Sequence, residues 1–194
     1  EMNSDGIGYI RITEFDSVTY DQFASALEDL EAQGMTGLVI DLRDNPGGNL
    51  DTVCDILDLI LPEGTIVSTK DKNGEGETYT SDEEHKLEIP LSVLTNGNSA
   101  SASEIFAGAV QDYGVGTLVG TTTFGKGIVQ QIFPLTDGTS IKLTISEYFT
   151  PKGRNIHGTG IDPDVEVEYE YNEEDPAADN QLEKAIEIVK GNGM

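Results

Sequence analysis

The chain has 194 residues, and 36 Asp and Glu against 11 Lys and Arg give a formal net charge of −25 at pH 7. This length suits one domain with a sizeable buried core. Because so acidic a surface repels polyanions, the charge argues against nucleic acid and anionic lipid as partners. The single cysteine, Cys54, excludes an internal disulfide, and no apolar stretch is long enough to span a bilayer.

The chain begins at Glu1 without a recognisable targeting segment, and we expect this start to be a trimmed one. Alternating apolar residues predict a first strand over residues 8–12. Thr19 and Gln22 have the spacing of a capping box, and Gly34 is a suitable stop for the helix that follows. The first unit is therefore expected to be a strand followed by an amphipathic helix.

Residues 37–42 form a short apolar run that is typical of a buried strand. The turn residues 43–48 lead from it into a helix expected over residues 50–61 and ended by Pro62. Cys54 lies on the apolar face of this helix, so we interpret it as a buried structural thiol.

The rest of the chain continues the alternation of strands and helices. An acidic, glycine-containing excursion follows Pro62, and its middle is expected to be a hairpin turn. The remaining expected strands cover residues 65–69, 77–80, 91–95, 117–120, 128–133, 140–148 and 165–168, and the remaining helices cover 101–113 and 178–189. The segments 128–133 and 140–148 are expected to pair across the Asp137-Gly138 turn. The order β-α-β-α-β-β-β-α-β-β-β-β-α predicts an α/β protein with buried strands that feed helices.

The run Ser99-Ala100-Ser101-Ala102-Ser103-Glu104 places serines where a strand turns into a helix, and Lys126 follows between two glycines. A serine hydroxyl is a poor nucleophile until a base takes its proton, and a lysine can do so only when it is held neutral. The two histidines, His85 and His157, have no matching context and no metal-ligand spacing, so Lys126 is the better base candidate and no metal site is predicted. A lysine base predicts loss of activity on the acid side.

Two expected loops could supply an oxyanion hole. The Pro46-Gly47-Gly48 turn lets backbone approach a ligand, and the N–H of Ala102 follows Ser101 at a helix N-terminus. Each feature also has a plain structural interpretation. Ser101 and Glu104 have capping-box spacing, the glycines are common turn residues, and Ser99 and Ser103 compete with Ser101 as nucleophiles.

Taken together, these motifs resemble those of the carboxyl-terminal processing peptidases, a family of serine endopeptidases that includes the tail-specific protease. The resemblance covers about residues 6–168, in the family's order. It rests on residues 8–12, 37–48, 96–105, 111–113, 119–120, 123–127, 129–130, 148–154 and 160–164.

The resemblance implies a catalytic dyad of Ser101 as nucleophile and Lys126 as general base. It implies that Gln130 orients the lysine amine, and that the N–H groups of Gly47 and Ala102 form the oxyanion hole. No cofactor is implied. The implied fold is the spiral β-β-α core of the Clp protease/crotonase type.

The resemblance also sets the expected organisation. We expect one peptidase catalytic domain over residues 1–194, with an acidic insertion at about 65–89 and a C-terminal strand and helix at about 164–190. The expected partners are polypeptide substrates, and a PDZ domain that family members carry is expected in the full-length protein but has no counterpart here. The expected location is extracytoplasmic in a bacterium, either in the periplasm or in the cell envelope with an N-terminal anchor.

Two alternatives remain open at this stage. A relative of the same fold could bind peptides without cutting them, although Ser101, Lys126 and Gln130 are all present. A CoA-thioester enzyme of the hydratase type could use the same oxyanion loops, but it normally needs acid and base carboxylates and basic residues for the CoA phosphates. The few basic residues of this chain argue against it.

Overall fold

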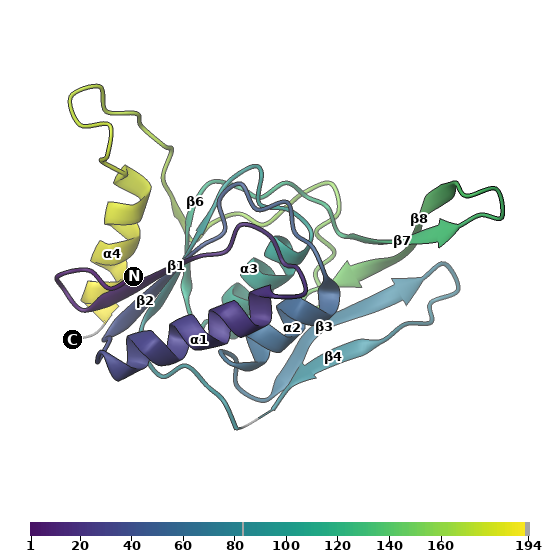
Figure 1. The fold of residues 1–194 in the computed structure, drawn as a ribbon, viewed down its shortest axis with the longest axis horizontal. Helices are drawn as coiled ribbons and strands as arrows, with labels where there is room; N and C mark the ends of the chain where they lie inside the picture. Colours follow the sequence, from purple (N-terminus) through teal and green to yellow (C-terminus); the bar gives the residue numbers. More distant parts are fainter. Residues whose placement is uncertain (83, 193–194) are drawn as a thin grey trace.

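The computed structural model describes residues 1–82 and 84–192, apart from the side chain of residue 192. Its order of elements is the predicted one (Figure 1). The helices are α1 (Thr19–Ala32), α2 (Leu50–Asp58), α3 (Ala102–Tyr113) and α4 (Asn180–Asn192). The strands are β1 (Ile7–Arg11), β2 (Gly37–Asp41), β3 (Gly64–Asp71), β4 (Thr78–Ser81), β5 (Leu91–Thr95), β6 (Thr117–Gly120), β7 (Ile128–Pro134), β8 (Ser140–Phe149) and β9 (Val165–Glu166).

A parallel sheet with the order β1-β2-β5-β6-β9 forms the centre of the molecule. All residues of β2 and β5 are buried, as expected for strands covered on both faces. Helices α1, α2 and α3 pack on one face around a core that includes Leu38, Ile40 and Phe106. Helix α4 covers the other face, where Val39 and Leu94 contact Ala185 and Val189 (Figure 1).

A second, antiparallel sheet has the order β4-β3-β8-β7 and extends away from the first as two hairpins (Figure 1). Strands β7 and β8 pair across the Asp137-Gly138 turn, as the sequence predicted. The base of this sheet belongs to the main core, because Ile66, Val67 and Tyr148 are buried there.

Most element boundaries differ from the predicted ones by one to three residues, as in α4, which covers Asn180–Asn192 where 178–189 was expected. Thr19 does not cap α1 from outside, because it is already the first helical residue and its hydroxyl donates to Glu14 O and accepts from Asp16 N–H. Helix α2 ends at Asp58, so residues 59–61 turn out of the helix before Pro62. Strand β9 has two residues in place of the four expected at 165–168.

The topology brings three loops to one edge of the parallel sheet. Strands β2, β5 and β6 are neighbours and run in the same direction, so the loops after their carboxyl ends meet. These loops are residues 42–49, 96–101 and 121–127, and they carry every residue of the predicted catalytic site except two. Ala102 is the first residue of α3, and Gln130 is the third residue of β7.

Candidate active site

Ser101 lies at the turn from β5 into α3 with a backbone conformation that L-residues rarely adopt, φ +57° and ψ −114°. Such a conformation costs of order 1–3 kcal/mol and persists only where the surroundings impose it, most often at functional sites. A sharp strand-to-helix turn of this kind presents a serine hydroxyl at the mouth of a helix. Ser101 is half-buried and lines a cleft.

The two competing serines are structural. Ser99 is fully buried, and its hydroxyl donates to Leu42 O at 2.8 Å. Ser103 is also fully buried, and its hydroxyl donates to Asn45 O at 3.0 Å. Both serines thus attach the loop that carries Ser101 to the loop after β2, and of the three only Ser101 borders the cleft.

Glu104 connects the backbone of Ser101 to the backbone of Lys126. Its carboxylate is fully buried and accepts the backbone N–H groups of Ser101 at 2.9 Å and Lys126 at 2.8 Å. It also accepts Gly125 N–H at 2.7 Å and the Thr123 hydroxyl at 2.6 Å. Four hydrogen bonds compensate the burial of its charge. Its position in the first turn of α3 adds to this, because the N-terminal end of a helix carries a partial positive charge. The capping residue that the sequence predicted is therefore also the link between the loops that carry Ser101 and Lys126.

Tyr148 makes a second link between these loops. It is 1% exposed, and its hydroxyl donates to Lys126 O at 2.7 Å and Ser101 O at 3.0 Å. Burial, reinforced by the charge of Glu104, raises the pKa of Tyr148, so the hydroxyl stays protonated and remains a donor. The sequence predicted no role for Tyr148, because both of its partners are distant along the chain, at 22 and 47 positions.

The glycines beside Lys126 are required by a neighbouring loop. A Cβ on Gly127 would lie 2.7 Å from His157 N, and one on Gly125 would lie 3.0 Å from Gly160 N. Gly125 also has φ +89°, where glycine is favoured. The close packing of residues 125–127 against residues 157–160 fixes the backbone of the half-buried Lys126.

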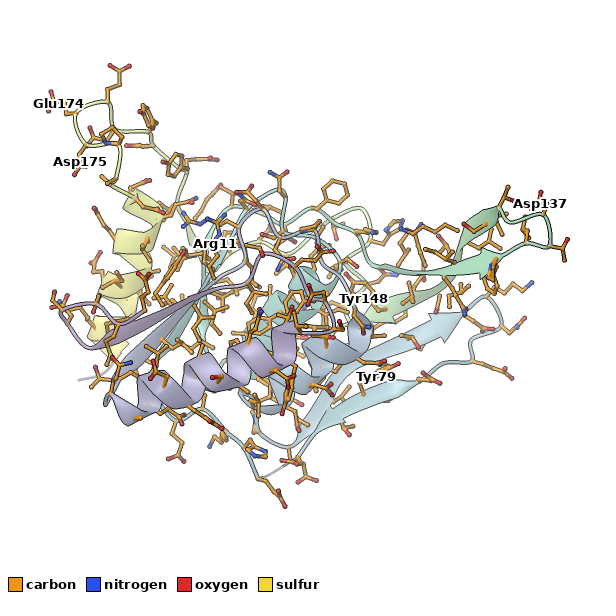
Figure 2. The ribbon with its side chains drawn as sticks, in the orientation of Figure 1. Arg11, Tyr79, Asp137, Tyr148, Glu174 and Asp175 are labelled. Carbon is orange, nitrogen blue, oxygen red and sulfur yellow. The ribbon has the colours of Figure 1, made fainter. Side chains whose placement is uncertain are left out.

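A cleft at the carboxyl edge of the parallel sheet has a volume of about 840 Å³, and all five predicted site residues line it. Tyr148 and Tyr79 come to it from β8 and β4 of the second sheet (Figure 2). Its lining includes Gly47, Ala102, Ser101, Lys126, Gln130, Glu14, Gly48, Asp51, Ile105, Val129, Gln131, Lys142, Ile145 and Tyr148.

The predicted oxyanion donors lie next to each other. A Cβ on Gly47 would be 2.9 Å from Ala102 N and 2.7 Å from Ser101 Cβ, so only glycine fits there. The N–H groups of Ala102 and Gly48 have no acceptor within the described part of the chain. The N–H of Gly47 donates to Asn45 Oδ1 at 2.8 Å, which the sequence did not foresee.

Gln130 lines the cleft, but its amide hydrogen bond goes to Thr144 Oγ1 at 3.5 Å, across β7 and β8. Arg154 and His157 do not line the cleft. Arg154 pairs with Asp112 at 2.6 Å, and His157 is exposed.

The sequence did not predict two side-chain clusters, because each cluster joins residues from distant parts of the chain. The Arg43 guanidinium bonds Asp41 and Asp179 at 2.7 Å each and Gln181 at 3.0 Å, which attaches α4 to the loop after β2.

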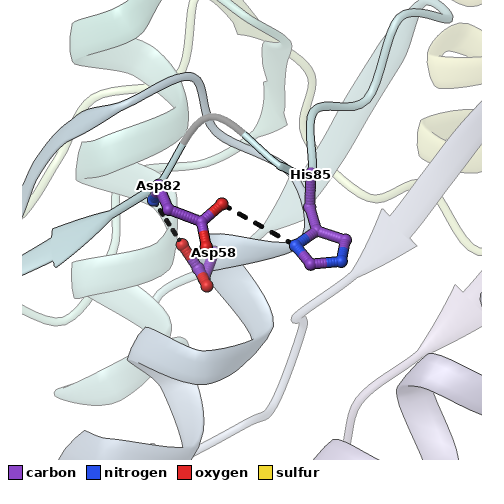
Figure 3. Close-up of side chains that lie close together, drawn as sticks. All are labelled: Asp58, Asp82 and His85. Atoms are coloured by element: carbon purple, nitrogen blue, oxygen red, sulfur yellow. Dashed lines mark hydrogen bonds and ion pairs between the residues drawn. The ribbon is translucent and has the colours of Figure 1, made fainter.

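The second cluster consists of Asp58, Asp82 and His85. His85 Nδ1 lies 3.7 Å from Asp82 Oδ1, and Asp82 N–H donates to Asp58 Oδ1 (Figure 3). Ligand atoms of these last three residues are close enough to reach one cation, although no metal site was predicted there.

A buried parallel sheet with a strained serine, a lysine and free N–H groups at its carboxyl edge defines an α/β protein with the Clp protease-like fold. The chain belongs to peptidase family S41, whose family model matches residues 6–167. The carboxyl-terminal-processing protease of Synechocystis sp. is 45% identical over 188 residues, which are 95% of this chain and 44% of the relative. The carboxy-terminal processing protease CtpB of Bacillus subtilis is 42% identical and covers 86% of this chain and 35% of the relative.

Solved structures agree with this assignment. The photosystem II D1 C-terminal processing protease superposes with a TM-score of 0.78 at 36% identity, covering 84% of this chain and 42% of that one. The chain thus spans less than half the length of these relatives. Among residues 1–82 and 84–192, none of the helices has the length and apolarity that crossing a bilayer requires.

Proposed function

We propose that the chain is the catalytic unit of a serine endopeptidase that cleaves polypeptides near their C-termini through a Ser101/Lys126 dyad. The observation that carries the proposal is the Glu104 carboxylate, which holds the backbone of both residues at one cleft. The relatives named as carboxyl-terminal processing proteases support the substrate class.

In the proposed reaction, Ser101 Oγ attacks the scissile carbonyl carbon while its proton moves to Nζ of Lys126. The negative charge that develops on the carbonyl oxygen is stabilised by backbone N–H groups. The C–N bond then breaks, and the proton passes to the leaving amine. Water attacks the acyl-enzyme in the same way and releases the new C-terminus and Ser101.

Ala102 N–H is the first proposed oxyanion donor, and Gly47 N–H is the second. Gly47 must share or exchange its hydrogen bond to Asn45 Oδ1 when the oxyanion forms. Loss of one such donor typically costs about 3–4 kcal/mol of transition-state stabilisation. The neighbouring Gly48 N–H, which has no acceptor within the described part of the chain, is available to replace it. We further propose that Gln130 turns from Thr144 to orient the lysine amine during the reaction.

The alternative is a catalytically silent peptide-binding relative of the same fold, and the engaged N–H of Gly47 is the observation that favours it. Cleavage of an unfolded polypeptide by the wild type, Ser101→Ala, Lys126→Ala and Lys126→Arg decides between the two. The dyad requires cleavage by the wild type alone, because arginine keeps the charge but cannot act as a base. Cleavage by Lys126→Arg would contradict the dyad, and no cleavage by the wild type with retained peptide binding would favour the alternative.

Two further parts of the proposal concern the whole protein. We propose that the catalytic unit works outside the cytoplasm and with a PDZ domain that presents substrate C-termini, as its resemblance to processing peptidases suggests. The named relatives from Synechocystis and Bacillus are bacterial proteins. Fractionation of the source cells tests the location.

A further inference from the structure

The β7–β8 hairpin carries an apolar face that nothing within the described part of the chain covers. The hairpin extends from the body of the molecule, with Asp137 at its tip (Figures 1 and 2). Four large apolar side chains on it are 36–44% exposed: Phe133, Ile141, Leu143 and Ile145. Contiguous apolar surface on a soluble protein commonly marks a binding site.

Strand register places three of these side chains, Phe133, Ile141 and Leu143, on one face. Phe133 pairs with Ile141, and Gln131 pairs with Leu143, so these four residues point to the same side. Val129 lies two positions before Gln131 on this face and pairs with Ser146. The register shift between Val129 and Gln130 leaves Ile145 as the additional residue of β8 at this point.

The same face is continuous with the active-site cleft. Val129, Gln131 and Ile145 line the cleft together with Ser101 and Lys126. An occupant of the cleft that extends toward the tip therefore meets Leu143, Ile141 and Phe133 next.

The charge of the hairpin differs from that of the rest of the molecule. Residues 128–149 contain two acidic side chains, Asp137 and Glu147, and one basic side chain, Lys142, within a chain of net charge −25. The hairpin therefore offers a surface that is apolar and nearly neutral. Strand β7 is also the edge of its sheet, so its outer backbone groups are free to pair with an extended chain.

We propose that this face of the hairpin is a substrate-binding arm that holds an extended, apolar stretch of the polypeptide beyond the scissile bond. The inference rests on the proposed function and adds its substrate class, unfolded polypeptide segments rich in large aliphatic and aromatic residues. An acidic or strongly polar segment gains nothing from these contacts.

The test compares the double variant Ile141→Thr/Leu143→Thr with Ile132→Thr, a matched control on the opposite face that is 62% exposed. Threonine keeps the preference for strand, and the sites are solvent-exposed, so the hairpin is retained. Two substrates are used, a long peptide rich in Leu and Val and a short activated ester that cannot reach the hairpin. For the double variant we expect kcat/KM on the long peptide to fall about tenfold, equivalent to about 1.4 kcal/mol. Hydrolysis of the ester should not change, and Ile132→Thr should match the wild type on both substrates.

A binding measurement separates this inference from the proposed chemistry. The same substitutions are made in Ser101→Ala, and binding of the labelled long peptide is followed by fluorescence anisotropy. Weaker binding by the double variant alone supports the arm even if the wild type cuts nothing. Equal binding and equal kcat/KM would overturn the arm and leave the dyad intact. A double variant that changes only the sedimentation of the protein would assign the face to a second copy of the chain and also overturn the proposal.

Discussion

Glu104 serves the α3 helix and the catalytic site with one carboxylate. Its Oε2 accepts both Ser101 N–H and Lys126 N–H, and its Oε1 accepts Gly125 N–H and the Thr123 hydroxyl. All four partners are donors, so the position requires a group that only accepts. The carboxylate therefore sets the distance between the backbones of the proposed nucleophile and base.

Replacing Glu104 by Gln tests this arrangement with little change in volume. The new amide NH₂ would face N–H donors in a buried site, so the free energy of unfolding should fall by about 1–3 kcal/mol. Because both catalytic loops lose their common acceptor, kcat/KM should fall as well. Urea unfolding and peptide hydrolysis measure the two effects, and exposed Glu28→Gln on α1 is the control. Unchanged stability and activity in Glu104→Gln would show that the carboxylate holds neither loop.

Tyr148→Phe removes only the hydroxyl that joins the Ser101 and Lys126 carbonyl groups. The expected loss is about 1 kcal/mol of unfolding free energy together with reduced kcat. Tyr113→Phe is the matched control, because the Tyr113 hydroxyl donates to Thr65 O at 3.0 Å away from the cleft. The control should lose similar stability and keep full activity. Equal kcat in the two variants would mean that Tyr148 supports the fold alone.

Local patterns predicted the elements of this chain well because most of the signals are short-range. Apolar runs marked β2 and β5, Gly34 marked the end of α1, and Asp137-Gly138 marked the hairpin. Sequence reasoning did not foresee the partition into two sheets or the attachment of α4. The reason is that Arg43 and Asp179 are 136 positions apart, and no local pattern encodes their contact.

The attachment of α4 should depend on pH. Burial disfavours the charge of Asp179, but the Arg43 guanidinium and the Leu182 N–H outweigh it and hold the pKa of Asp179 below its ordinary value of 3.8. A carboxyl group with a lowered pKa in the folded state stabilises the protein above its unfolded pKa, and this stability is lost as the pH falls through the folded value. Helix α4 should therefore loosen only in strong acid.

Urea midpoints of the wild type and Asp179→Asn between neutral pH and pH values below 3.8 check this expectation. The variant should be less stable at neutral pH, and its difference from the wild type should shrink in acid. Glu170→Gln, an exposed change near α4, should leave the pH profile as it is. A difference between Asp179→Asn and the wild type that stays constant down to the lowest pH would contradict the role of the ion pair.

At the scale of the whole molecule, the net charge of −25 opposes the compact state through self-repulsion. Salt screens such repulsion, with a Debye length that falls to about 10 Å at 0.1 M. We therefore expect the midpoint of thermal unfolding at pH 7 to rise when sodium chloride is added. A midpoint that falls with salt would mean that the ion pairs, such as Arg43 with Asp41 and Asp179, outweigh the repulsion.

The proposed site lies at the carboxyl ends of β2, β5 and β6. We propose that Lys126 activates Ser101 there. The most direct measurement is labelling with a serine-reactive phosphonate, followed by mass spectrometry of the digested protein. The account predicts one adduct on Ser101 in the wild type, and a rate of labelling that drops strongly in Lys126→Ala. An adduct on another serine, or equal labelling of Ser101 in both proteins, would contradict it.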